Sequence, residues 1–128
     1  MLALTLIPLS AIVITFCTKY KDLKEPCKYT YEYSATTVCP SLDHKYLFSL
    51  EKCSDGYRCY IERIPSFRGR STSNYQYHTY VESSSKRHYV CWTGKVKYFE
   101  QAKTLCRNWA NATQQFIDTG VPAPGFER

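Results

Sequence analysis

The sequence of 128 residues lacks the short motifs that mark the common enzyme classes. It contains no G-x-S-x-G turn, no H-E-x-x-H pair, no phosphate-binding glycine loop and no EF-hand loop. These absences exclude the serine hydrolases, zinc proteases, nucleotide-binding enzymes and calcium sensors that those motifs define. Internal repeats and low-complexity tracts are also missing, which argues against a repeat array.

Ligand spacing for a zinc site is absent as well. There is no C-x-x-C pair, and the three histidines, His44, His78 and His88, are not spaced as ligands of one ion. We therefore expect a protein without a metal and without a small-molecule cofactor.

Residues 1–17, MLALTLIPLSAIVITFC, lack any charged side chain. This apolar run is short for a membrane span and is followed at once by the polar TKYKDLK. It predicts a signal peptide that is cleaved after Cys17, with a retained signal anchor as the alternative. We then expect residues 18–128 to form one secreted, extracellular domain without stable membrane insertion; uptake into a host cell is an open alternative.

Cleavage after Cys17 would leave six of the seven cysteines. An even number in a short secreted chain predicts three disulfides rather than a zinc site, and leaves no cysteine as a nucleophile. The six are Cys27, Cys39, Cys53, Cys59, Cys91 and Cys106.

Five segments alternate with the two-residue period of a β-strand: residues 28–34, 45–50, 56–64, 74–82 and 87–92. Asp55-Gly56, between Cys53 and Cys59, is a turn signal that predicts a hairpin. The third segment sets an apolar face against a polar one: Tyr57, Cys59 and Ile61 against Arg58, Tyr60 and Glu62.

From residue 98 the period changes to that of an amphipathic helix, predicted over residues 98–118 and ended by Gly120 and Pro122. Its apolar stripe is Phe99, Ala102, Cys106, Trp109, Thr113 and Phe116. The pattern predicts an α+β fold, a small disulfide-stabilised antiparallel sheet with one C-terminal helix packed on it. Residues 18–26 and 119–128 are expected to be extended or flexible. Cys106 would face the sheet, where Cys91 is the expected partner and a cysteine of another strand the alternative.

The mature domain carries the whole net charge of +6, which suggests an anionic partner such as a nucleic acid, an acidic glycan or a membrane surface. Two basic loops flank a tyrosine-rich segment, an arrangement suited to tracking an RNA backbone and stacking its bases. Solvated loops are the simpler interpretation. The candidate RNA-binding residues are Arg68, Arg70, Lys86, Arg87, Tyr77 and Tyr80.

RNA cleavage needs a general base and a general acid, and His78 with Glu62 or Glu82 could supply them. The alternative is that His78 and Glu82 only solubilise an outward strand face. Asn111 begins an N-glycosylation sequon, and we expect it to point outward from the helix, although a helical position disfavours glycosylation.

The stretch YVCWTGKVKYFEQAKTLCRNWANATQQF, residues 89–116, resembles the Y-x-C strand, glycine turn and helix of fungal secreted proteins of the ribonuclease T1-like group. That group includes the inactive RNase-like effectors of powdery mildews. The resemblance maps Y-x-C to Tyr89, Val90 and Cys91, and the family's tyrosine-flanked catalytic histidine to His78, with Glu82 as its acidic partner. In the family the helix precedes the histidine strand, whereas here it is predicted to follow.

Together these patterns predict a secreted, monomeric, effector-like protein that binds a host protein, RNA or another polyanion without catalysis. A ribonuclease using His78 with an acidic partner is one alternative. An extracellular inhibitor or toxin acting through the loop at residues 64–73 is another.

Overall fold

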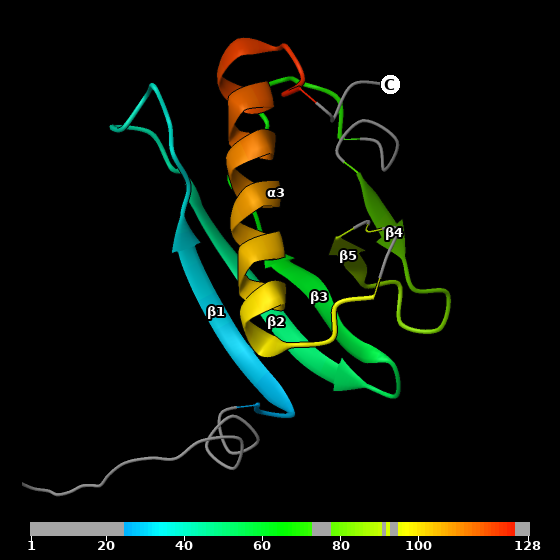
Figure 1. The fold of residues 1–128 in the computed structure, drawn as a ribbon. Helices are drawn as coiled ribbons and strands as arrows, with labels where there is room; N and C mark the ends of the chain where they lie inside the picture. Colours follow the sequence, from blue (N-terminus) through cyan, green and yellow to red (C-terminus); the bar gives the residue numbers. More distant parts are fainter. Residues whose placement is uncertain (1–24, 73–77, 91, 93–94, 125–128) are drawn as a thin grey trace, which may run out of the picture.

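A computed structural model of the chain describes residues 25–72, 78–90, 92 and 95–124. They form a five-stranded antiparallel sheet with one long helix packed on one face (Figure 1), as the sequence predicts. Within these ranges no helix has the length and apolar character needed to cross a membrane. The sheet order is β1-β2-β3-β5-β4, and the elements are β1 (Lys28–Ser34), β2 (Lys45–Cys53), β3 (Gly56–Arg63), β4 (Thr79–Val81), β5 (His88–Val90) and α3 (Phe99–Thr119).

The predicted hairpin is the centre of the sheet. β2 and β3 pair up to Cys53 opposite Gly56, which leaves Ser54 and Asp55 as the loop. Gly56 has φ 132°, and a Cβ there would lie 2.3 Å from the Val96 carbonyl oxygen. Glycine is therefore required at this position. It lets the segment before α3 approach β3 closely enough for the Val96 carbonyl oxygen to accept a hydrogen bond from the Tyr57 N–H.

The last two strands are shorter than the alternation predicts. β4 covers Thr79–Val81 of the predicted 74–82, and β5 covers His88–Val90 of the predicted 87–92; residues 74–77 and 91 lie outside the described ranges. His78 and Lys86 have φ of 57° and 64°, left-handed conformations that a strand does not contain. The prediction that His78 lies in a strand is therefore wrong.

The core lies between α3 and the central strands. Trp109, only 1% exposed as predicted, packs edge-on against the rings of Tyr46 and Phe48, each with its centroid 5.9 Å away. The buried face of the helix differs from the predicted stripe in its last turn. Ile117 is buried there in place of Phe116, which is half-buried and packs against Phe67.

The helix ends where the sequence predicts. Gly120 adopts φ 78°, and its N–H donates to the carbonyl oxygen of Phe116 at 2.8 Å. A left-handed residue after the last turn is the commonest helix stop, and glycine adopts it without a steric penalty.

Candidate functional site: the far face of the sheet

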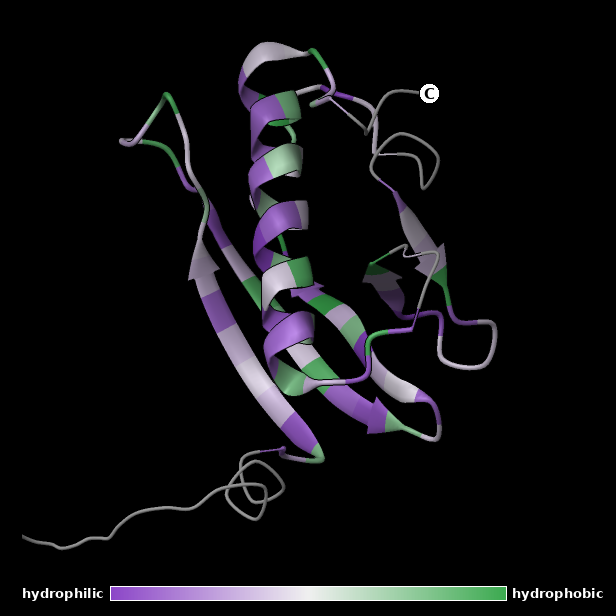
Figure 2. Ribbon diagram, in the orientation of Figure 1, coloured by the Kyte–Doolittle hydropathy of each residue, from purple (hydrophilic) through white to green (hydrophobic). Residues whose placement is uncertain are grey.

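β3 has an apolar side and a polar side, and hydrophobic and hydrophilic residues follow one another along it (Figure 2). Cys59 points toward α3 and is buried, so its neighbours Arg58 and Tyr60 point to the opposite side, here called the far face. Side chains from the adjoining strands and turns join them there. We call this set the tyrosine–arginine cluster: Glu51, Arg58, Tyr60, Glu62, Tyr80, Glu82, Arg87 and Tyr89.

Three tyrosines form a row across the strands of the cluster. Tyr60 pairs with Tyr89, and Tyr89 pairs with Tyr80. Their ring centroids are 5.9 Å and 5.5 Å apart in that order. The guanidinium of Arg58 lies 4.3 Å from the Tyr89 ring centroid, and that of Arg87 lies 3.6 Å from the Tyr60 centroid. A guanidinium over a tyrosine ring is a favourable cation–π arrangement, so two of the three rings each lie against an arginine.

Both arginines of the cluster form ion pairs with glutamates. Arg87 donates to both oxygens of Glu51, at 2.7 and 3.3 Å, and to Glu62 at 2.8 Å. The hydrogen bonds from Arg87 are the main reason that the pKa of Glu51 lies below its ordinary value. Each cation of the cluster is thus already matched by an acidic side chain.

Glu82 is the acceptor of the second pair. It receives hydrogen bonds from Arg58 at 3.0 Å and from the Tyr60 hydroxyl at 2.7 Å, besides one from Ser85. The bonds from Ser85 and Tyr60, and then the charge of Arg58, hold the pKa of Glu82 below its ordinary value. The carboxylate is therefore ionised at neutral pH and is a weak proton acceptor.

The histidines are placed less favourably for catalysis. His88 alternates with Tyr89 and so points to the α3 side of the sheet, where its Nδ1 lies 3.4 Å from the Thr79 hydroxyl. His78, with its left-handed backbone, lies just before β4, and Glu82 lies just after it, so the three residues of β4 separate the two along the chain. A general acid and a general base must both reach one phosphodiester, so this spacing does not favour the predicted pair.

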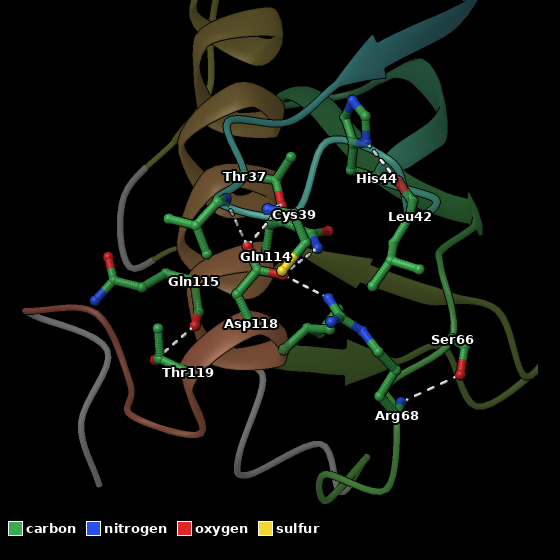
Figure 3. Close-up of polar contacts among 12 residues, drawn as sticks. Thr37, Cys39, Leu42, His44, Ser66, Arg68, Gln114, Gln115, Asp118 and Thr119 are labelled. Carbon is green, nitrogen blue, oxygen red and sulfur yellow. Dashed lines mark hydrogen bonds and ion pairs between the residues drawn. The ribbon is translucent and has the colours of Figure 1, made fainter.

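Arg68 and Arg70 lie at the other end of the molecule, against the end of α3. Arg68 forms an ion pair with Asp118, and the Nε of Arg70 donates to the Ile117 carbonyl oxygen at 3.2 Å. Figure 3 shows Arg68, Thr37 and Gln114 converging on Asp118. These contacts join the two arginines to the fold, and their binding of RNA stays a prediction.

Asp118 is the centre of this second polar network. Its carboxylate is 3% exposed and accepts from Thr37, from the Val38 backbone N–H and from Gln114. Burial by itself would raise the pKa of this carboxyl, but the hydrogen bonds outweigh burial and the net pKa is lowered. The network pins the loop between β1 and β2 to the helix end.

The remaining candidate residues are scattered. Lys86 is exposed in the turn between β4 and β5, and Tyr77 lies outside the described ranges. Asn111 does not point outward as expected: its side-chain oxygen accepts from the Tyr33 hydroxyl at 3.1 Å and from the Thr36 N–H at 2.9 Å. A residue engaged with β1 in this way is a poor glycan acceptor, although glycosylation itself stays untested.

No disulfide joins the five cysteines that the structure describes. Cys27 and Cys53 are exposed, Cys39 is half-buried, and Cys59 and Cys106 are buried. Cys91 lies outside the described ranges, so its predicted bridge to Cys106 does too. In that same part of the chain, no group of three or more metal-binding side chains comes together.

The structure therefore brings together four of the predicted site residues: Glu62, Tyr80, Glu82 and Arg87. Sequence reasoning missed Glu51, Tyr60 and Tyr89 as site residues. The alternation of β3 already placed Tyr60 with Arg58 and Glu62, so that signal was available. Glu51 and Tyr89 are brought in by strand pairing, which the local pattern does not reveal.

The fold and the site define a small α+β protein with one helix-covered sheet face and one face lined by tyrosine, arginine and glutamate. Comparisons with protein-family models, with curated proteins and with solved structures found no match for this chain. The resemblance to the ribonuclease T1-like group thus stays a prediction.

Proposed function

We propose that this chain is a secreted, effector-like protein that acts without catalysis and binds a protein partner beside the tyrosine–arginine cluster. An exposed aromatic rim is the observation that supports it. Tyr80 is 47% and Trp92 54% exposed, and both line a pocket of about 230 Å³ together with Arg58 and Tyr89. Tryptophan, tyrosine and arginine around a pocket are the residues that dominate protein–protein binding energy.

A protein fits this surface better than RNA does. The cluster has two arginines and three glutamates, so its cations are already paired. A phosphate would have to displace a carboxylate from Arg58 or Arg87 before it gained a contact. A protein partner can instead place an apolar side chain in the pocket and complement the mixed charges around it.

One observation favours the ribonuclease as a second candidate. Arg58 and the Tyr60 hydroxyl both donate to Glu82 on one sheet face, and these two donors could hold a phosphodiester that displaced the carboxylate. The inhibitor alternative has less support, because Phe67 is buried and Arg68 pairs with Asp118 in the loop that would have to be presented.

The test compares Tyr80→Ala/Trp92→Ala with a control at the opposite end of the sheet, Leu42→Ala, which removes a side chain of similar exposure. Partners captured by the wild type and by the control, but lost from the double variant, are purified and their Kd measured. A hot-spot pair is expected to weaken binding by about 30-fold or more, since 2 kcal/mol is close to that factor.

Equal binding by the double variant and the wild type would contradict the proposal. Purified wild-type protein is also incubated with single-stranded RNA in low salt. We expect no cleavage; cleavage that disappears in Glu82→Gln or His78→Ala would favour the ribonuclease instead. Tight RNA binding that falls steeply with salt, without cleavage, would replace the protein partner with RNA.

A further inference from the structure

Two buried cysteines meet where α3 packs on the sheet. Cys59 of β3 is 2% exposed and Cys106 of α3 is fully buried. Both belong to one hydrophobic cluster with Leu50, the cross-strand neighbour of Cys59, and with Ala102. They come from elements far apart in the chain, so only the tertiary fold brings them together.

The helix geometry places the two cysteine side chains over the same turn of α3. The Sγ of Cys59 lies 3.7 Å from the carbonyl oxygen of Ala102, one helical turn before Cys106. Side chains on a helix lean toward its N-terminus, so the Cys106 side chain lies over that same turn. Burial raises the pKa of the Cys106 thiol, and the Cys59 thiol beside it raises it further.

We propose that Cys59 and Cys106 form a disulfide in the secreted protein and thereby join β3 covalently to α3. One thiol, deprotonated, attacks a disulfide oxidant of the secretory pathway, such as an oxidoreductase disulfide or glutathione disulfide, and forms a mixed disulfide. The second thiolate then displaces the oxidant's sulfur. The two cysteines lose two electrons and two protons, and the oxidant leaves as its reduced thiols. Because burial opposes thiolate formation, we expect the exchange to take place during folding, once α3 has reached the sheet but while the two thiols are still open to the oxidant.

This pairing differs from the one that the sequence favours. If Cys106 is bonded to Cys59 and all six cysteines are bridged, Cys91 pairs with Cys27, Cys39 or Cys53. Cys59 also lies between Arg58 and Tyr60, so the bridge fixes from the α3 side the strand that carries the tyrosine–arginine cluster. The inference rests on the secretion of the chain, which is part of the proposed function, and on the packing of the two cysteines, but it does not depend on binding by the tyrosine–arginine cluster.

Tryptic mapping of the secreted wild-type chain tests the pairing directly, because cleavage after lysine and arginine places each of the six cysteines in a peptide of its own. Free thiols are first blocked with N-ethylmaleimide in denaturant without reductant, at mildly acidic pH to prevent exchange. We expect CYIER, which carries Cys59, to be linked to TLCR, which carries Cys106, in a species that separates on reduction.

TLCR linked to HYVCWTGK, the Cys91 peptide, would overturn the proposal, as would maleimide on both Cys59 and Cys106. In Cys59→Ser we expect maleimide on Cys106, whereas Cys53→Ser, an exposed control, should keep the CYIER–TLCR link. The wild-type map decides the matter even if a variant fails to be secreted.

Discussion

The two faces of this sheet are built from the same strands but are held by different forces. Toward α3, Tyr46, Phe48 and Trp109 are at most 1% exposed and pack ring against ring. On the far face, Arg87 and Glu62 remain about one third or more exposed and are joined by charge. Apolar burial contributes about 25 cal/mol per Å², whereas an exposed ion pair contributes about 0–1 kcal/mol. Most of the stability therefore comes from the α3 side, and a substitution on the far face is expected to cost less.

The largest expected effect on stability comes from removing a large buried side chain between α3 and the sheet. Trp109→Ala should lower the free energy of unfolding by about 3–5 kcal/mol, because it removes the ring between Tyr46 and Phe48. Urea denaturation followed by circular dichroism measures it. Trp92→Ala is the matched control, since Trp92 is 54% exposed, and should change stability by about 0.5 kcal/mol or less. Equal losses in the two variants would remove the distinction between the faces.

The second-largest loss of stability is expected at the C-terminal end of α3. Asp118→Asn replaces a buried charge that accepts several hydrogen bonds, and should cost about 2–3 kcal/mol at neutral pH. Asp43→Asn is the control, because its pair with Arg63 is about half exposed, and should cost at most about 1 kcal/mol.

The pH dependence of this loss has a definite sign. The folded pKa of Asp118 lies below its ordinary value, so the unfolded chain binds the proton more tightly. The stabilisation is complete above the ordinary pKa of about 3.9 and is lost as the pH falls through the folded pKa. The difference between wild type and Asp118→Asn should therefore shrink below about pH 4. A gap that widens on acidification would contradict this.

The same contrast explains what the sequence could predict. β1, β2, β3 and α3 have long periodic patterns, with a buried face in β2, β3 and α3 and a partly buried one in β1, so the local period was sufficient to predict them. The positive φ of His78 interrupts an alternation that otherwise reads as one strand. The roles of Arg68 and Arg70 could not be predicted, because they bind residues 50 and 47 positions away along the chain. The tyrosine–arginine cluster was predictable in part. The alternation of β3 places Arg58, Tyr60 and Glu62 on one face, whereas Tyr89 joins them through the pairing of β3 with β5, which the local sequence does not reveal.

A moderate effect is expected on the far face itself. Arg87→Met keeps an apolar stem over Tyr60 but leaves Glu51 and Glu62 without their shared cation. We expect a loss of about 1 kcal/mol in the free energy of unfolding, mostly from repulsion between the two carboxylates. Denaturation at neutral pH measures it. Because Arg87 lowers the pKa of Glu51, NMR titration of that carboxyl should move toward its ordinary value in the variant; an unchanged titration would show that the pair does not form.

The smallest effect is the coupling between Arg58 and Glu82, which lie 3.0 Å apart with side chains 38% and 25% exposed. A double-mutant cycle with Arg58→Ala and Glu82→Ala isolates their interaction from the contacts that each makes with Tyr89 and Tyr60. We expect a coupling of about 0.5–1 kcal/mol in low salt, because water screens a partly exposed pair. It should weaken further when salt shortens the screening length from about 10 Å at 0.1 M to about 3 Å at 1 M. A coupling of several kcal/mol that resists salt would mean that water is excluded from the far face and that the pair contributes to stability as a buried interaction does, and the contrast between the two faces would then fail.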